Sequence, residues 1–222
     1  MLNDQFVEGA IIVPTNPNNP LNSVIDDDPM VPMVLRTNKA IGFTENEIFD
    51  QAHLTYDSSY QASQEHSPTF QAHMRAMLLL LRGRFPAQTK ITEIGCGKGA
   101  FMSMLEQDGY QRVVGYDPTY DGEKENIRRQ YLTGSDRLDA VLYVMRHTLE
   151  HIPRPHEFLR MIYDLSVNRE CTIYVEAPCF DWAKRNDAFF GITYEHPSYF
   201  SLHALNAMFG NKVISSGHVF NG

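Results

Sequence analysis

The sequence predicts an α/β fold with a doubly wound, mostly parallel sheet that has helices on both faces. Two observations predict this class. Short apolar runs recur along residues 91–217, and most are separated by segments long enough for a helix. The runs are apolar at successive positions, as in strands covered on both faces, and strands that alternate with helices form parallel sheets.

Residues 1–66 precede this pattern and differ from it. Residues 1–40 are rich in Pro and Asn, and because proline interrupts strands and helices, we expect an irregular arm or a few short strands. Residues 41–66 are polar with scattered aromatic side chains, which favours helix with turns. We therefore expect an N-terminal arm over residues 1–66 that forms a lid, and a core over residues 67–222.

The first strongly predicted element is a helix that begins after Ser67. Serine is a favoured N-cap residue, Pro68 suits the first helical position, and Arg82 followed by Gly83 is typical of a helix end. One apolar stripe recurs at helical spacing along this segment: Phe70, Met74, Met77, Leu78 and Leu81. The stripe predicts which face of the helix is buried.

Five apolar runs predict the strands of the sheet. They are ITEIG (91–95), RVVGYD (112–117), DAVLYVM (139–145), CTIYVEAP (171–178) and KVISSG (212–217). The last run follows a helical stretch at residues 201–209. Ligands of doubly wound sheets lie beyond the carboxyl ends of the strands, so the segments that leave these runs are the places to look for a site.

A glycine-rich loop follows the first of these runs. In EIGCGKGAF, Gly95, Gly97 and Gly99 allow a tight turn and let a ligand approach the main-chain N–H groups at the start of the next helix. Asp117 ends the next strand, 22 residues after Gly95, where a carboxylate can accept hydrogen bonds from ribose hydroxyls. We therefore expect a cofactor that contains a nucleoside.

The glycine pattern alone leaves three interpretations open. Ala100 completes G-x-G-x-x-A, which is compatible with a dinucleotide and with NAD-dependent oxidoreduction. A tight turn with nothing bound would use the same glycines. Glu93 precedes the loop and favours a cationic cofactor, because a carboxylate attracts a cation and repels a pyrophosphate. S-adenosylmethionine (SAM) carries a sulfonium and an ammonium group and no phosphate.

Together, EIGCGKGAF, GYDP and RHTLEHIPRPHEFL resemble the class I SAM-dependent methyltransferases, in this order and spacing. The resemblance covers roughly residues 67–217 and implies a Rossmann-like core of seven strands with SAM over the ends of strands one and two. It implies a glycine loop, a ribose-binding acid and a segment that lines the methionine end of the cofactor. The residues that match, with Glu93 before them, are Gly95, Gly97, Gly99, Asp117, Arg146 and His147. Two strands should follow the run at residues 171–178, and the sequence predicts only the one at residues 212–217.

A finer resemblance concerns YDSSYQASQEHSPTF (56–70) and YEHPSYFSLHAL (194–205). These segments resemble the sugar C-methyltransferases that act on nucleotide-linked keto-deoxysugars, although their cysteine-rich zinc module and their further C-terminal domain are not seen in this sequence. The resemblance implies that Tyr194, Glu195 and His196 lie at the substrate, with His196 as the general base. An unperturbed histidine titrates near pH ~6.5, and transfer to a carbon next to a carbonyl needs a base.

Tyr56 and Tyr60 are candidates for the substrate side of the site. An aromatic face near a sulfonium gains about 0.5–2 kcal/mol of cation–π energy. Ordinary packing of half-buried tyrosines explains their presence equally well.

A metal site is not expected. His147, Glu150 and His151 spell H-x-x-E-H, a pattern that can bind zinc when it lies on a helix. Pro153 and Pro155 follow almost at once and end such a helix. We therefore expect Glu150 and His151 to cap and pack a short helix, and the sequence contains no CxxC pair.

Composition narrows the partners. The net charge is −8 without a basic cluster, which argues against binding to nucleic acid. The sequence has no apolar run long enough to cross a membrane, and its first residues lack the pattern of a secretory signal. Three widely spaced cysteines fit reduced thiols in the cytoplasm.

The sequence thus predicts a SAM-dependent methyltransferase that acts on a small-molecule acceptor, in its most concrete form by C-methylation next to a carbonyl with His196 as base. One alternative is O- or N-methylation of another small molecule. Two further alternatives are a SAM-binding module without turnover and an NAD-dependent oxidoreductase.

Overall fold

The structure is a computed structural model that describes residues 6–11, 33–54, 67–166, 171–188 and 191–219. Tyr56 and Tyr60 lie outside the described residues. The described chain forms two compact units, which we call the antiparallel unit (Met1–Thr55, Leu149–Phe158 and Ala177–Gly222) and the parallel unit (Tyr56–Thr148 and Leu159–Glu176). Within these described ranges, no helix is both long and apolar enough to cross a membrane.

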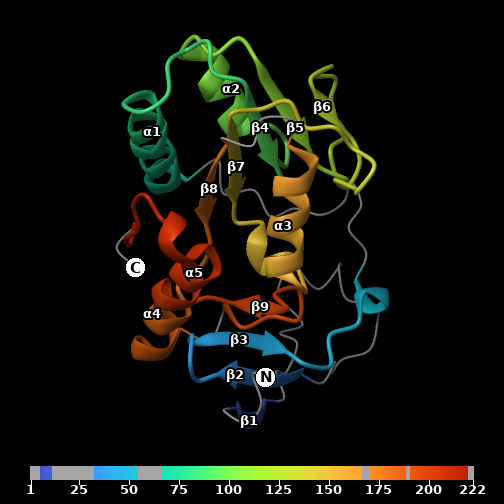
Figure 1. The fold of residues 1–222 in the computed structure, drawn as a ribbon, viewed down its shortest axis with the longest axis vertical. Helices are drawn as coiled ribbons and strands as arrows, with labels where there is room; N and C mark the ends of the chain where they lie inside the picture. Colours follow the sequence, from blue (N-terminus) through green and yellow to red (C-terminus); the bar gives the residue numbers. More distant parts are fainter. Residues whose placement is uncertain (1–5, 12–32, 55–66, 167–170, 189–190, 220–222) are drawn as a thin grey trace. The chain divides into compact units, whose positions relative to one another are not determined.

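The elements of the chain are shown in Figure 1. In chain order they are β1 (Phe6–Ile11), β2 (Met33–Asn38), β3 (Phe43–Asn46), η2 (Gln51–His53), α1 (Pro68–Arg82), β4 (Ile91–Ile94), α2 (Ala100–Gln107), β5 (Val113–Tyr116), β6 (Ile127–Arg128), β7 (Leu142–Arg146), η3 (Leu149–His151), α3 (Pro155–Leu165), β8 (Thr172–Glu176), α4 (Phe180–Arg185), β9 (Ser198–Tyr199), α5 (Leu202–Phe209) and η5 (Gly210–Lys212).

The parallel unit contains the predicted doubly wound sheet. Its five strands lie in the order β6-β5-β4-β7-β8, and every neighbouring pair is parallel. The chain moves outward from β4 to β6, then returns to the other side of β4 with β7 and β8. This reversal makes the end of β4 the switch point of the sheet, which is where doubly wound folds bind ligands. The predicted α/β class is confirmed.

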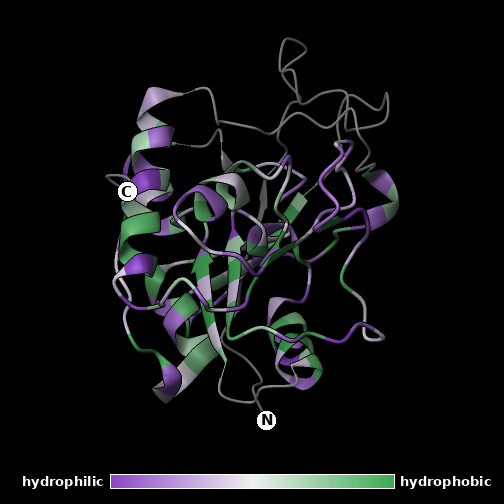
Figure 2. Cartoon of the chain, turned by 90° about the horizontal axis from the view of Figure 1, so that it is seen from above, coloured by the Kyte–Doolittle hydropathy of each residue, from purple (hydrophilic) through white to green (hydrophobic). Residues whose placement is uncertain are grey.

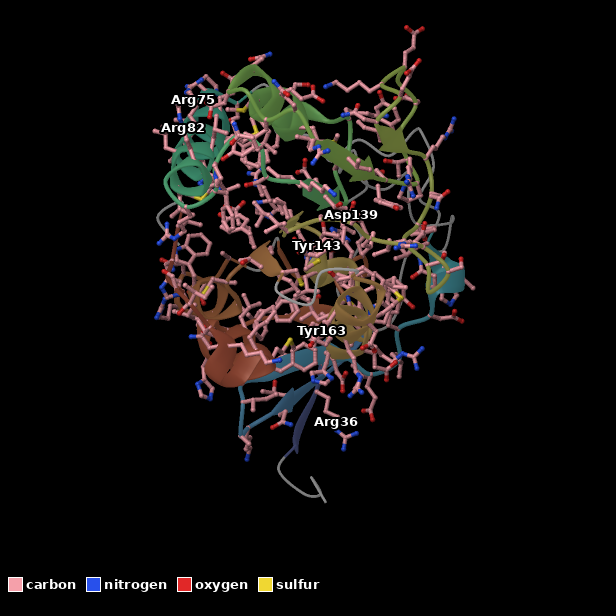
Figure 3. All side chains as sticks on the ribbon, turned by 45° about the horizontal axis from the view of Figure 1, so that its top comes forward. Arg36, Arg75, Arg82, Asp139, Tyr143 and Tyr163 are labelled. Atoms are coloured by element: carbon pink, nitrogen blue, oxygen red, sulfur yellow. The ribbon has the colours of Figure 1, made fainter. Side chains whose placement is uncertain are left out.

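The two faces of the sheet are covered by different helices. Leu142 and Val144 of β7 join a buried cluster with apolar residues of α1 and α2. Tyr143 lies between them in sequence and so points to the opposite face, where its hydroxyl bonds Ser166 Oγ at 2.9 Å, just after α3. The strands near the centre of Figure 2 are accordingly mostly apolar, and Tyr143, labelled in Figure 3, is fully buried.

Helix α1 has the predicted ends and the predicted buried face. Ser67 Oγ accepts a hydrogen bond from Phe70 N at 3.4 Å, Pro68 begins the helix and Gly83 caps it. Its buried residues His73, Met74, Met77 and Leu81 include three of the five predicted apolar positions. Arg75 and Arg82 lie on the exposed face (Figure 3).

The antiparallel unit contains a sheet in the order β1-β2-β3-β9. Short strands were one of the two interpretations of residues 1–40, whereas β3 replaces the helix with turns expected over part of residues 41–66. The buried side chains of β3 are polar, so the sequence shows no alternating apolar pattern there. Thr44 Oγ1 bonds Thr37 Oγ1 at 2.7 Å, and Asn46 Oδ1 accepts from the Val34 N–H at 3.1 Å.

The pairing of strand β9 gives the chain a different division into units from the one expected at residue 67. Tyr199 of β9 pairs with Thr44 of β3, so residues 177–222 group with the N-terminal strands. These contacts cut across the expected division at residue 67. The assignment of residues 1–66 as a lid and residues 67–222 as a core stays a prediction.

The strand predicted at residues 212–217 is wrong. The described chain has η5 at Gly210–Lys212 and then neither helix nor strand through residue 219. Ile214 is 80% exposed. The run KVISSG has only two apolar side chains, too few to bury a strand face, and its apolar character gives a false strand signal.

The cluster between the sheet, α1 and α2 should dominate the stability of the parallel unit. Leu105 of α2 is fully buried in it, whereas Leu79 of α1 is 65% exposed. We expect Leu105→Ala to lower the free energy of unfolding by about 2–5 kcal/mol, because it leaves a cavity. Leu79→Ala, the matched control, should change it by less than about 0.5 kcal/mol. Urea unfolding followed by circular dichroism measures both, and equal losses would contradict this packing.

Candidate functional site

The glycine loop joins the end of β4 to the start of α2. Gly95, Gly97 and Gly99 have φ values of 72°, 54° and 79°, in the left-handed region that favours glycine. A Cβ atom on Gly95 would clash with Thr148 Oγ1, and one on Gly99 would lie 2.7 Å from Ile127 Cδ1. A Cβ on Gly97 would meet no atom within 4 Å. Two of the glycines are therefore required by packing, and Gly97 borders open space.

Asp117 fastens this loop to the end of β5. Its Oδ2 accepts a hydrogen bond from the Gly97 N–H at 2.7 Å. Its Oδ1 accepts from the Thr119 N–H at 2.8 Å and from the Thr119 hydroxyl at 2.6 Å. A carboxylate has about four acceptor positions, so this buried side chain can hold the loop and still accept from a ligand.

Glu93 lies buried on β4, directly before the loop. Burial has the largest effect and raises the pKa of Glu93. Arg146 lowers this pKa, whereas Asp117 and Glu176 raise it further, and the result is a pKa of about 8. Its Oε2 atom is buried and has no hydrogen-bond partner among the described residues. In the ligand-free protein at neutral pH the side chain is therefore mainly a neutral acid, whereas the sequence suggested a carboxylate.

Arg146 ends β7 and forms a buried ion pair with Glu176, the last residue of β8. Arg146 Nε donates to Glu176 Oε2 at 2.8 Å, and the guanidinium carbon lies 4.4 Å from the centre of the Phe101 ring. The Nη2 atom of Arg146 is buried without a hydrogen-bond partner in the described part of the chain. Arg146 therefore has a donor left for a ligand at the strand ends.

The Glu176 carboxylate has two further partners, Tyr174 and His73, which the sequence did not predict as residues of the site. Tyr174 donates its hydroxyl proton to Glu176 Oε1 at 2.6 Å, and His73 Nε2 lies 3.2 Å from the same oxygen. Burial alone would raise the pKa of Glu176, but Arg146, the Tyr174 hydroxyl and His73 outweigh burial and lower it. The register that pairs Arg146 with Glu176 is the signal that could have identified the ion pair.

His147 follows β7 directly and has a φ of 50°, which is uncommon for a residue other than glycine. Its N–H donates to Glu176 O at 3.0 Å. Its ring is exposed and lies 6.0 Å from the ring of Phe70, measured between centres. Backbone strain of this kind is common at functional sites, and it turns the chain sharply at the strand end.

In the antiparallel unit, Glu150 and His151 of η3 meet His196. One carboxylate oxygen and one nitrogen from each imidazole lie within 4.8 Å of one another. The two rings are 4.7 Å apart between centres and nearly perpendicular, at 78°. Burial, and then the nearby His196, lower the pKa of His151, against the opposing effect of Glu150 and Glu195.

Tyr194 and Glu195, the other two residues predicted to lie at the methyl acceptor, directly precede His196 and are buried. The Tyr194 hydroxyl accepts from the Asp50 N–H at 2.8 Å, and its ring packs on Phe49 with centres 5.4 Å apart. The Glu195 carbonyl lies 3.0 Å from His151 Nδ1, and the residue is 4% exposed. The structure thus brings Glu195 and His196 to His151 and ties Tyr194 to Asp50.

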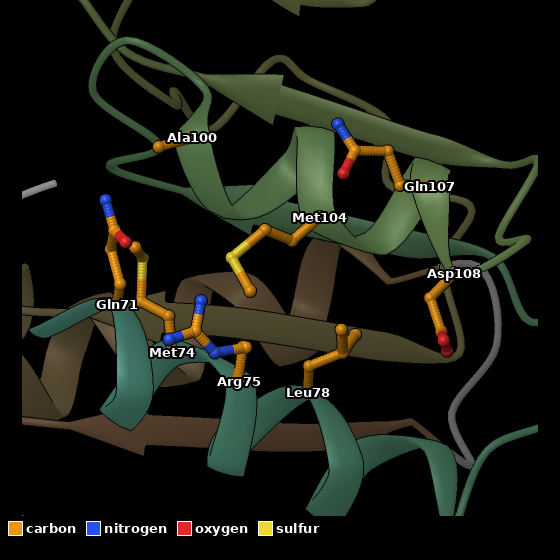
Figure 4. Close-up of a pocket in the computed structure, with 8 residues that line it drawn as sticks. All are labelled: Gln71, Met74, Arg75, Leu78, Ala100, Met104, Gln107 and Asp108. Carbon is orange, nitrogen blue, oxygen red and sulfur yellow. The ribbon is translucent and has the colours of Figure 1, made fainter. Parts of the chain in front are cut away.

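A pocket of about 600 Å³ lies elsewhere in the parallel unit (Figure 4). It is a groove between α1 and α2 lined by Gln71, Met74, Arg75, Leu78, Ala100, Met104, Gln107 and Asp108. None of the predicted site residues lines it. Because it lies along the helices rather than at the strand ends, we do not assign the cofactor to it.

Two solved structures of one methyltransferase share this fold. The plantazolicin methyltransferase BpumL in complex with SAH has a TM-score of 0.50 at 12% identity, over 66% of this chain and 63% of that chain. BpumL with a monoazolic desmethylPZN analog and SAH has a TM-score of 0.50 at 13% identity, with the same coverages. The YcgJ protein from Bacillus subtilis has a TM-score of 0.47 at 15% identity, over 63% of this chain and 66% of that chain. The chain thus spans under two thirds of the BpumL structures, and at these identities the likeness shows the fold alone.

The comparison with curated proteins finds no match. A family model described as a methyltransferase domain matches residues 63–212. This range covers more than half of the 222 residues and contains the glycine loop, Asp117, Arg146 and His196. The chain therefore belongs to this family of methyltransferase domains and has their Rossmann-like fold.

Proposed function

We propose that this chain binds SAM at the carboxyl ends of β4, β5 and β7 and transfers its methyl group to a small-molecule acceptor. The observation that carries the proposal is that Glu93 Oε2 and Arg146 Nη2, both buried at these strand ends, have no hydrogen-bond partner among the residues that the structure describes. The methionine end of SAM carries an ammonium and a carboxylate. The ammonium can bind the acid Glu93, and the carboxylate can accept hydrogen bonds from the guanidinium of Arg146.

The charges of the site favour a cationic cofactor. Glu93, Asp117 and Glu176 are buried acids, and Arg146 is the buried arginine among them. A sulfonium or ammonium placed there would favour the charged form of Glu93, whereas a pyrophosphate would add to the surplus of acids. This balance argues against the NAD alternative that Ala100 left open. Two structures of similar fold, both of BpumL, are complexes with SAH.

The loop geometry supports the nucleoside part of the proposal. The Asp117 carboxylate holds the Gly97 N–H at 2.7 Å, so the loop and the acid are fixed relative to each other before a ligand arrives. Gly97 borders open space, which lets a ligand approach the main chain closely. We assign the ribose hydroxyls to Asp117, and the methionine end to Glu93, Arg146 and the turn at His147.

For the acceptor, our finer proposal is C-methylation next to a carbonyl, with His196 as the base. His196 Nδ1 lies 3.1 Å from Gly191 O. A carbonyl oxygen can only accept, so this nitrogen carries the proton and the lone pair of the neutral ring is on Nε2. That tautomer can take a proton from an acceptor. Tyr194 and Glu195 would hold the segment in place, and O- or N-methylation, which needs positioning more than a base, is the alternative.

Removing the acid at the end of β5 should weaken cofactor binding. We expect Asp117→Ala to raise the Kd for SAH by about 10–150-fold, the worth of about 1.5–3 kcal/mol for hydrogen bonds to a charged group. Asp121→Ala is the matched control, because Asp121 is exposed and pairs with Lys98 at 2.7 Å. Equilibrium dialysis with labelled SAH measures both, after circular dichroism has shown that each variant is folded. Equal affinities would refute the ribose assignment.

The raised pKa of Glu93 predicts a pH-dependent stability. Its pKa is about 8 in the folded chain, against an ordinary value of 4.5, so between these values the folded state holds a proton that the unfolded state lacks. Stability must then fall as pH rises through this range. Glu93→Gln removes the effect, so the free energy of unfolding of the variant minus that of the wild type should grow from pH 5 to pH 8. The expected change is on the order of a few kcal/mol.

Urea unfolding at several pH values measures this difference. Glu157→Gln, at an exposed position of α3, is the control for the loss of a glutamate. A difference for Glu93→Gln that stays constant from pH 5 to pH 8 would show that Glu93 is charged in the ligand-free protein.

The base assignment predicts a large loss of turnover. With a true acceptor in hand, His196→Ala should lower kcat by about 10²–10⁴-fold, the usual contribution of a general base, and leave the affinity for SAH unchanged. His156→Ala, at an exposed position of α3, should leave both unchanged. Full turnover in His196→Ala would favour O- or N-methylation by positioning.

A further inference from the structure

We propose that Glu150, His151 and His196 form a binding site for a first-row divalent transition-metal ion such as Zn²⁺ or Co²⁺. The proposal goes beyond methyl transfer and rests only on the antiparallel unit. One ligand atom from each of the three side chains lies within 4.8 Å of the other two. Two imidazoles and one carboxylate are a donor set that first-row ions commonly use, with coordination positions left open.

The hydrogen bonds of both imidazoles suit metal binding. His151 Nδ1 lies 3.0 Å from Glu195 O, and His196 Nδ1 lies 3.1 Å from Gly191 O. Because carbonyl oxygens only accept, each Nδ1 carries the proton, and the lone pair of each neutral ring is on Nε2. A metal-binding histidine almost always donates its other N–H in this way, which fixes the tautomer and the ring orientation.

The two segments that carry these side chains are held together by the fold. Ser198 Oγ donates to Ile152 O at 2.6 Å, which joins the segment of His196 to the residue after His151. Asn46 N donates to Pro197 O at 2.8 Å, next to His196. These bonds set the distance between the ligands before an ion is bound, which lowers the cost of ordering them.

The donor set also indicates which ions fit. Imidazole nitrogen suits Zn²⁺, Co²⁺ and Ni²⁺ better than Mg²⁺, which prefers oxygen ligands. Bonds of about 2.0–2.1 Å place the donors about 3.0–3.4 Å apart, and the donors of this cluster, which lie within 4.8 Å of one another, can reach that spacing by side-chain rotation. The open positions would hold water or an oxygen atom of a ligand.

This site differs from the H-x-x-E-H site that the sequence suggested and that we expected to be absent. That motif needs His147 and His151 on one helix face, but η3 is a short 3-10 helix of residues Leu149–His151. The cluster contains His196 in place of His147. Proton acceptance and metal ligation use the same lone pair of His196, so a bound ion would replace the base role proposed above.

Titration of the EDTA-treated chain with Co²⁺ tests the site without SAM or an acceptor. We expect one Co²⁺ per chain, a rise in the midpoint of thermal unfolding of about 5–10 °C at ~100-fold excess over Kd, and no such rise with Mg²⁺. Proton NMR of the Co²⁺ form should show two exchangeable, strongly shifted signals, from Nδ1–H of His151 and His196. This spectrum tests the ligands in the wild-type chain, so it does not depend on whether a variant folds.

The variants His151→Gln, His196→Gln and Glu150→Gln should each weaken Co²⁺ binding by at least about 10–100-fold, the loss seen even for outer-shell partners. His156→Gln, at an exposed position of α3, and Glu157→Gln are the matched controls and should bind as the wild type does. The proposal is overturned if the wild type binds no stoichiometric Co²⁺, or if His151→Gln binds it equally well. The Co²⁺ titration contains no SAH, so failure of the metal site can be distinguished from failure of the SAM site.

Discussion

The carboxyl ends of β4, β7 and β8 can be buried only because Arg146 lies among their acids. A buried charge costs several kcal/mol unless it is paired and hydrogen-bonded. Arg146 meets this need for Glu176 directly, at 2.8 Å, and for Glu93 through space. One cation cannot neutralise all the acids nearby, and Glu93 responds by keeping its proton. Because the acids here outnumber the one arginine, these strand ends favour a ligand that carries positive charge.

The parallel part of the fold could be predicted because its strands are buried on both faces. Strand β7 is buried at every position and is apolar up to Arg146, so it appears in the sequence as an apolar run. Strand β4 is equally buried, with Ile91 and Ile94 on either side of the polar Thr92 and Glu93. The antiparallel strands lack this signal. The buried positions of β3 are Thr44 and Asn46, whose Oγ1 and Oδ1 atoms form hydrogen bonds to β2. Strand β6 has only two residues, too few to create a pattern.

The same contrast holds for the site: residues marked by their spacing along the chain could be predicted, whereas residues brought together by distant contacts could not. The glycine loop and Asp117 are marked by spacing along the chain, and the structure places them in direct hydrogen-bond contact. Glu176 and His73 could not be identified in this way, because their role depends on strand register and on the face of α1 that is buried. The meeting of His151 with His196 depends on the pairing of β9 with β3, which no periodicity indicates.

The central claim is that the buried acids around Arg146 and the loop held by Asp117 form a site for a cationic nucleoside cofactor. The most direct measurement is isothermal calorimetry of the full chain with SAM, SAH and NAD, titrated separately under the same conditions. The account predicts that SAM and SAH each bind at one site per chain and that NAD gives no heat of binding. Binding of NAD without binding of SAM or SAH would contradict it.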